Sequence, residues 1–129
     1  MTTELAMLAL SVLLGLLQTF IASETVTGQR SPQSAAGARD DPPRQLTAVP
    51  ARLQRAQRNF LETFPLFAAA VIVAHLAGRN GELTFWGVQL YLWGRVAYVP
   101  LYAFGVYMLR SLVWGVTILG IGLILVALL

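Results

Sequence analysis

Four long apolar stretches constrain the fold of this chain more than any other feature. They cover about residues 5–22, 51–77, 83–107 and 111–129, and the second becomes apolar from Phe60 onward. An α-helix needs about 20 apolar residues to cross the ~30 Å hydrocarbon core of a bilayer, and each stretch is close to that length. We therefore predict an all-α membrane protein, built as a bundle of four transmembrane helices.

The composition supports the same conclusion. The chain is 57% hydrophobic and 12% charged, whereas soluble domains are roughly 45–50% apolar and about 25% charged. Its 129 residues fit one domain, which we assign to residues 1–129. The first residues, Met-Thr-Thr-Glu, lack the positive charge of a signal peptide, so we expect the first helix to be retained.

All nine basic residues are arginine, and they give the chain a net charge of +3. Arginine forms bidentate pairs with carboxylates and phosphates. Because the arginines lie in and beside apolar spans, we predict no nucleic-acid partner. The absence of cysteine excludes disulfides, thiolate metal sites and a cysteine nucleophile, and we predict no metal site.

A polar stretch at residues 23–50, rich in Ser, Gly, Pro and Gln, connects the first two spans. It is longer than an ordinary connection, so we expect a functional loop or a partly disordered segment. In a four-span chain this loop shares one side of the membrane with the third connection, which we place at Arg110-Ser111. That side carries seven arginines: Arg30, Arg39, Arg44, Arg52, Arg55, Arg58 and Arg110. The other side carries Arg79, so the positive-inside rule predicts a cytoplasmic loop and termini on the non-cytoplasmic side.

Two stripes of polar side chains enter the apolar spans at helical spacing. On the second span, the stripe consists of Arg55, Asn59 and Glu62, at positions i, i+4 and i+7. On the third span, it consists of Arg95, Tyr98 and Tyr102, at positions i, i+3 and i+7. Polar groups in a membrane are costly unless they face a partner helix or a wet cavity. We expect the stripes to meet near the cytoplasmic side.

Two interpretations of these stripes remain open. In the first, Arg95 pairs with Glu62 and only holds the bundle together. In the second, the arginines outnumber the one acid and form a pocket for an anionic ligand. These arginines are Arg55, Arg58, Arg95 and Arg110. Carboxylates, phosphates or a thiolate would suit them, and the glutamate would suit a ligand that also bears an ammonium group.

The two motifs resemble those of the MAPEG family, the membrane-associated proteins of eicosanoid and glutathione metabolism. The run Arg55-Ala-Gln-Arg-Asn-Phe-Leu-Glu-Thr-Phe-Pro65 is similar to the family signature. The pattern Arg95-x-x-Tyr98-x-x-x-Tyr102 has the family spacing. The resemblance covers nearly the whole chain and is closest to the bacterial branch. It implies a homotrimer of four-helix bundles that binds glutathione between neighbouring subunits, near the cytoplasmic face.

The resemblance also implies roles for individual residues. Glutathione, or a related thiol, would be bound by Arg55, Arg58, Asn59, Glu62, Arg95, Tyr98 and Tyr102. Arg110 is the candidate for the catalytic arginine that lowers the pKa of the thiol. The sequence departs from the family at Thr63, where some members have a tyrosine that contacts glutathione, and in having no arginine within the first span.

The function implied is that of a glutathione-dependent transferase or peroxidase in the bacterial inner membrane. Its partners would be copies of itself, membrane lipids and a lipophilic electrophile that arrives from the bilayer. The alternative is a non-catalytic trimeric membrane protein that binds a lipid or a small anion. A transporter is a weaker interpretation because the chain has no inverted repeat.

The remaining polar and aromatic residues of the spans are interpreted as structural. We expect His75 to be structural or interhelical, and Gln18 to form an interhelical hydrogen bond or to line a site. Trp86, Trp93 and Trp114 are expected at the membrane interface or in packing. Glycines of the fourth span, Gly115, Gly120 and Gly122, are expected to permit close helix approach.

Overall fold

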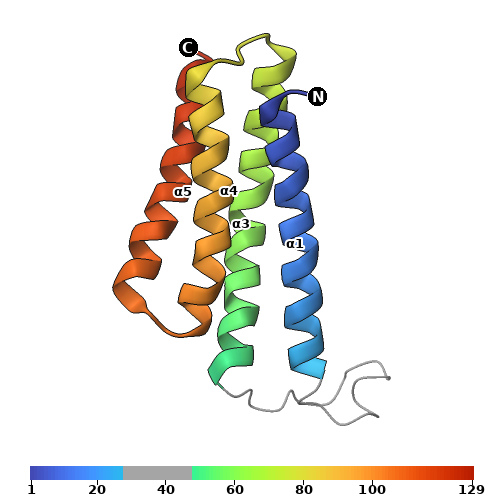
Figure 1. The fold of residues 1–129 in the computed structure, drawn as a ribbon, viewed down its shortest axis with the longest axis vertical. Coiled ribbons are helices and arrows are strands. Elements are labelled where there is room, and N and C mark those ends of the chain that lie inside the picture. Colours follow the sequence, from blue (N-terminus) through green and yellow to red (C-terminus); the bar gives the residue numbers. More distant parts are fainter. Residues whose placement is uncertain (28–47) are drawn as a thin grey trace.

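The computed structural model describes residues 1–27 and 48–129, which form four helices (Figure 1). These are α1 (Thr3–Thr27), α3 (Ala48–Leu76), α4 (Glu82–Ala103) and α5 (Tyr107–Ala127). Most of the polar stretch predicted at residues 23–50 lies outside the described residues. Its first part, Ser23-Glu24-Thr25, continues α1.

The helices run antiparallel, as the prediction of four spans requires. Both termini and the α3–α4 turn lie at one end of the bundle (Figure 1). The α4–α5 turn, the end of α1 and the start of α3 lie at the other end. Helix α4 packs against each of the other three helices. The predicted all-α four-helix bundle is therefore confirmed.

Three of the described helices are long and apolar enough to cross a membrane, and they are α1, α3 and α5. Helix α4 is long enough but less apolar than these three, because Gln89, Arg95 and several tyrosines and tryptophans lower its mean hydropathy. Its 22 residues nevertheless give a length of roughly 33 Å at 1.5 Å per residue. Because it joins turns at opposite ends of the bundle, it crosses the same thickness as its neighbours.

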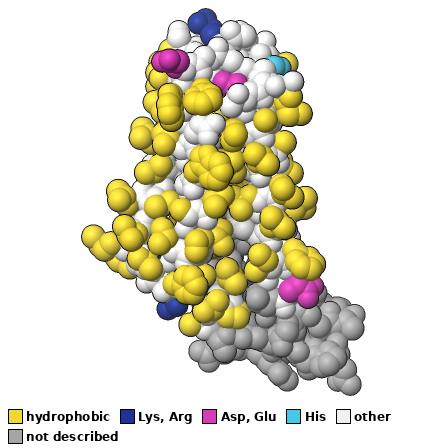
Figure 2. All heavy atoms as spheres, in the orientation of Figure 1, with side chains coloured by type: hydrophobic (Ala, Val, Ile, Leu, Met, Phe, Trp, Pro, Cys, Tyr) yellow, Lys and Arg dark blue, Asp and Glu magenta, His cyan; other side chains and the backbone are white. Residues whose placement is uncertain are grey.

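Hydrophobic side chains cover most of the visible face of the bundle, and charged side chains gather toward its two ends (Figure 2). Large apolar residues such as Leu16, Phe20 and Leu112 are about two-thirds exposed. In water such a surface would be unfavourable, but in lipid it is the expected exterior. The chain is an integral membrane protein.

Helices α4 and α5 approach closely at two glycines that face each other. A Cβ on Gly87 would lie 2.6 Å from the carbonyl oxygen of Gly120, and a Cβ on Gly120 would lie 2.6 Å from that of Gly87. Gly120 therefore has the role predicted for it. Within the described part of the single chain, a Cβ on Gly115 or Gly122 would meet nothing within 4 Å, so these two glycines do not permit a close approach between the described helices.

The α4–α5 turn lies earlier in the chain than the sequence suggested. Helix α4 ends at Ala103 rather than Tyr107, and α5 begins at Tyr107, so Arg110 lies in a helix and not in the turn. Gly105, at φ 73°, adopts the left-handed conformation that glycine favours. Its N–H donates to Tyr102 O, and Val106 N–H donates to Leu101 O. This pair of bonds is the Schellman motif that ends many helices.

Candidate functional site

The structure brings seven of the eight predicted site residues around one cleft. The cleft has a volume of about 230 Å³, and α3, α4 and α5 supply its lining: Arg55, Arg58, Asn59, Glu62, Tyr98, Tyr102 and Arg110. Its residues come from the parts of these helices that lie toward the α4–α5 turn. The eighth residue, Arg95, is fully buried and contacts Asn59 and Tyr98 from within the bundle.

Arg95 is held by a side-chain amide and a backbone carbonyl. Its Nη1 donates to Asn59 Oδ1 at 2.8 Å, and its Nη2 donates to Ala56 O at 3.4 Å. Its Cζ lies 4.3 Å from the centroid of the Tyr98 ring and 5.4 Å from that of Phe60. Its Nε is buried and has no hydrogen-bond partner in residues 1–27 and 48–129. Arg95 is thus oriented by neutral groups and aromatic faces.

The ion pair between Arg95 and Glu62, considered from the sequence, is not formed in the described part of the chain. Glu62 is exposed, and its carboxylate makes no hydrogen bond or ion pair there. Asn59, one turn before it on α3, occupies the position beside Arg95. The carboxylate therefore remains available to a ligand in the cleft.

Arg55 and Arg110 approach the same tyrosine from different helices. Arg55 Nε donates to the Tyr102 hydroxyl at 3.2 Å. Arg110 Cζ lies 4.7 Å from the centroid of the Tyr102 ring and 5.2 Å from that of Tyr107. With Arg58 also in the lining, three guanidinium groups face one carboxylate, that of Glu62. The cleft carries a positive surplus and is suited to an anion that also bears one cationic group.

The turn between α4 and α5 explains how Arg110 reaches the cleft. Because the Schellman motif at Gly105 ends α4 early, Arg110 becomes the fourth residue of α5. Its backbone N–H donates to Val106 O at 3.1 Å, inside the first helical turn. This places its side chain over Tyr102, a residue of the last turn of α4.

A smaller cleft of about 180 Å³ adjoins the first and shares Asn59, Tyr98 and Arg110 with it. Ser111 and Trp114 complete its lining. Sequence reasoning missed Ser111 as a lining residue and expected Trp114 at the membrane interface or in packing. Their positions one and four residues after Arg110 on the same helix are the signal that could have identified them.

Thr63 points into the bundle core, away from the cleft. It is buried, its hydroxyl donates to Phe60 O at 3.3 Å, and it lies 3.0 Å from the hydroxyl of Tyr91. The position at which some family members have a tyrosine is therefore used here for core packing.

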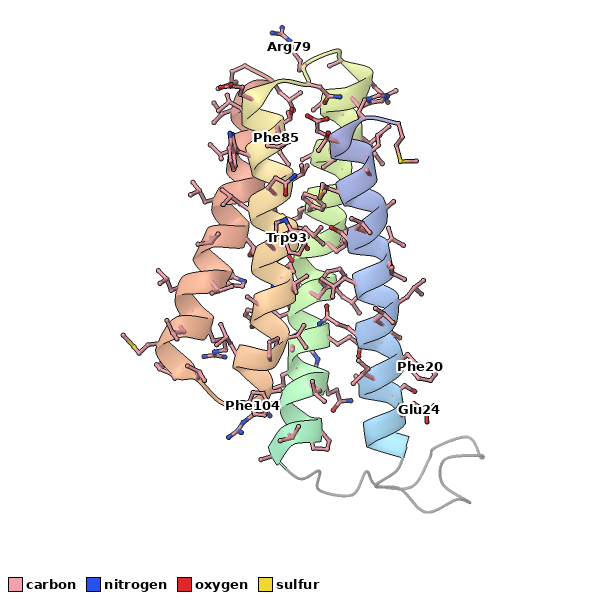
Figure 3. All side chains as sticks on the ribbon, viewed as in Figure 1. Phe20, Glu24, Arg79, Phe85, Trp93 and Phe104 are labelled. Carbon is pink, nitrogen blue, oxygen red and sulfur yellow. The ribbon has the colours of Figure 1, made fainter. Side chains whose placement is uncertain are left out.

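Other residues considered from the sequence lie apart from this site. His75 Nδ1 lies 3.2 Å from Asn80 Nδ2 near the α3–α4 turn. Gln18 is buried, and its Oε1 has no hydrogen-bond partner among the described residues. The next residue, Thr19, accepts an interhelical hydrogen bond from Gln57 at 2.9 Å. Trp93 projects from the middle of α4 (Figure 3). The described residues contain no group of three or more His, Asp or Glu side chains that could bind a metal ion.

Comparison with known proteins gives one match. The family model described as the MAPEG family matches residues 7–129, nearly the whole chain. No curated protein and no solved structure matches the sequence. The match includes α1 from residue 7 onward, the whole of α3, α4 and α5, and every residue of the cleft, and on this evidence the chain belongs to the MAPEG family of membrane proteins.

Proposed function

We propose that this protein binds glutathione in the cleft and transfers it to a lipophilic electrophile. The observation that carries the proposal is the convergence of three arginines and one glutamate, Arg55, Arg58, Arg110 and Glu62, on one cleft. Glutathione has two carboxylates, one ammonium group and one thiol, so its charges complement this lining. Members of the MAPEG family generally use glutathione, which supports the assignment.

In this proposal different polar side chains bind different charged groups of the ligand. Glu62 accepts hydrogen bonds from the ammonium group, and Arg55 and Arg58 bind the carboxylates in the bidentate geometry that guanidinium favours. Asn59, whose side chain is held by the hydrogen bond from Arg95, orients the ligand within the cleft. Arg95 does not line the cleft and acts as a positioning residue through Asn59 and Tyr98.

Arg110 is proposed to activate the thiol. A guanidinium group close to a thiol lowers the pKa of the thiol because it stabilises the thiolate. The thiol proton passes to water, and the thiolate sulfur then forms a bond to the electrophilic carbon while the leaving group departs with its electron pair. In the peroxidase reaction, the thiolate sulfur would attack an oxygen of a lipophilic hydroperoxide, the O–O bond would break and an alcohol would leave. A second glutathione would then attack the oxidised sulfur, water would leave, and the two thiols would end as a disulfide. The smaller cleft beside Arg110, with Trp114 in its lining, is the proposed entry for a lipophilic substrate.

We further propose the assembly and orientation typical of the family. Arg55, Arg58 and Glu62 are exposed in the single chain, which agrees with a homotrimer in which a neighbouring subunit covers the ligand. The arginines at the α4–α5 end outnumber those at the other end, which supports a cytoplasmic position for the cleft and non-cytoplasmic termini, in a bacterial inner membrane.

A thiol-transfer assay tests the activity. Purified protein is mixed with glutathione and a halo-aromatic electrophile, and the thioether is followed for wild type, Arg110→Gln and Arg79→Gln. Arg79 lies at the opposite end of the bundle (Figure 3), so its variant is the control for loss of one charge. We expect Arg110→Gln to lower the rate by roughly 10²-fold, as loss of an electrostatic stabiliser does, and Arg79→Gln to keep the wild-type rate.

The result that would contradict the proposal is a wild-type rate equal to the uncatalysed reaction. If the protein still bound an anion under those conditions, the non-catalytic alternative would replace the transferase assignment.

A further inference from the structure

A second cationic cavity lies next to the cleft, at the α4–α5 turn. It has a volume of about 210 Å³ and is lined by Arg52, Arg55, Tyr102, Gly105, Tyr107 and Arg110. Three of these residues also line the cleft, but Arg58, Asn59 and Glu62 do not line the cavity. Among the residues that the structure describes, the cavity lining therefore has three guanidinium groups and no carboxylate. A ligand with an ammonium group would find no partner here, whereas a purely anionic group would be matched in charge.

Arg52 is placed against the backbone of the turn. Its Nη1 reaches Ala103 O at 3.5 Å, which is a long hydrogen bond to one of the last carbonyls of α4. A Cβ on Gly105 would lie 3.0 Å from Arg52 Cζ, so the glycine makes room for the guanidinium. Guanidinium has five N–H donors, and this is the one hydrogen bond that Arg52 makes in the described part of the chain. Most of its donors remain available to an oxygen ligand.

The surroundings of the cavity are apolar and exposed. Phe104 is 76% exposed, Tyr107 70% and Met108 77%, and Leu109 and Leu112 continue this surface along α5. Phe104 projects at this end of the bundle (Figure 3). In a membrane, side chains of this kind would contact acyl chains, while Arg52, Arg55 and Arg110, which lie at the same end of the bundle, would be at the level of the head groups. The cavity thus combines an anion site with a lipid-facing rim.

We propose that this cavity binds the phosphate of an anionic phospholipid, with Arg52 as its distinguishing ligand and the lipid chains along Phe104, Met108 and Leu112. Phosphate oxygens accept paired hydrogen bonds from guanidinium groups. A lipid whose head group adds an amine would be disfavoured, because the cavity lining offers that amine no carboxylate. The inference does not depend on glutathione binding.

The test compares lipid binding by three variants. Protein in phosphatidylcholine nanodiscs is titrated with phosphatidylglycerol of the same acyl chains, and bound lipid is measured by native mass spectrometry after release. We expect wild type and Arg79→Gln to prefer phosphatidylglycerol by about tenfold or more, and Arg52→Gln to lose this preference, since charge-assisted hydrogen bonds are the strong ones. Tyr107→Leu alters the cavity without touching Arg52 and is expected to weaken the preference as well, which keeps the test valid if Arg52→Gln does not fold.

Two controls separate this proposal from its rivals. Soluble glycerol phosphate is added as a competitor, and we expect it not to displace the lipid at equal concentration; equal displacement would overturn the lipid assignment in favour of a small-anion site. Equal loss of preference in Arg52→Gln and Arg79→Gln would overturn it in favour of diffuse attraction between charges. Glutathione binding, measured on the same samples, is expected to persist in Arg52→Gln, so failure of either proposal is recognised separately.

Discussion

Replacing Asn59 by leucine tests how the buried guanidinium of Arg95 is stabilised. Arg95 is fully buried, and its shortest hydrogen bond, at 2.8 Å, is to Asn59 Oδ1. The remaining bond, to Ala56 O, is 3.4 Å long, and Nε already lacks a partner. A hydrogen bond to a charged group contributes about 1.5–3 kcal/mol. Because leucine fills the space but offers no acceptor to the guanidinium, we expect Asn59→Leu to lower the free energy of unfolding by about 2–3 kcal/mol.

Removing the charge itself should cost less than removing its partner. Arg95→Met loses the contacts with the rings of Tyr98 and Phe60, at about 0.5–2 kcal/mol. It also removes the desolvation cost of a buried charge, and apolar replacements of buried ions are often neutral or stabilising. We expect Arg95→Met to lie within about 1 kcal/mol of wild type, and the double variant to resemble Arg95→Met, which gives a coupling energy of about 2 kcal/mol.

Unfolding in mixed micelles, followed by tryptophan fluorescence, would measure the four free energies of this cycle. If Arg95→Met were as destabilising as Asn59→Leu and the two effects simply added, the reasoning would be refuted. Arg95 would then be a residue that stabilises the bundle, and not one that serves the cleft at a cost in folding stability.

Three further predictions use the same unfolding measurement. Gly87→Ala places a Cβ 2.6 Å from the Gly120 carbonyl and should destabilise by about 1–3 kcal/mol or more, whereas Gly122→Ala, with open space around it, should be neutral or stabilise by about 0.5–1 kcal/mol; similar effects would contradict the α4–α5 packing. Thr63→Val leaves the buried Tyr91 hydroxyl without its partner and should cost about 1–2 kcal/mol, and a neutral effect would place Thr63 outside the core. Gln18→Met removes a buried acceptor that has no donor and should be neutral or stabilise by about 1 kcal/mol; a loss of stability would reveal a partner for Gln18.

The bundle and the meeting of the two polar stripes follow from the sequence. Helical spacing puts Arg55, Asn59 and Glu62 on one face of α3, and Arg95, Tyr98 and Tyr102 have the corresponding spacing on α4. Since consecutive spans are antiparallel, residues early in α3 must lie beside residues late in α4. These two rules explain why the structure brings the stripes to one end of the bundle.

Helix rotation and turn position do not follow from such rules. Asn59 and Glu62 are one turn apart, and which of them reaches Arg95 depends on how α3 is rotated against α4, which is determined by packing over its whole length. Likewise, Thr63 follows Asn59 by four residues, a helical spacing that suits a site residue. The rotation of α3 instead turns Thr63 toward Tyr91.

The end of α4 and the start of α5 were each predicted about four residues too late in the chain, because the apolar pattern continues through Phe104 and Val106 without a change in composition. Gly105 is the signal that ends the helix, since the Schellman motif needs a residue in the left-handed conformation. Reading that glycine as a helix end would have placed Arg110 in α5.

Glutathione binding to the purified protein is the most direct test of the central claim. Titration calorimetry would compare wild type, Arg55→Gln and the distant control Arg79→Gln in the same detergent. The proposed site predicts saturable binding to wild type and Arg79→Gln, and affinity weaker by about tenfold or more in Arg55→Gln. Absence of saturable binding to wild type, or unchanged affinity in Arg55→Gln, would contradict the assignment of the cleft.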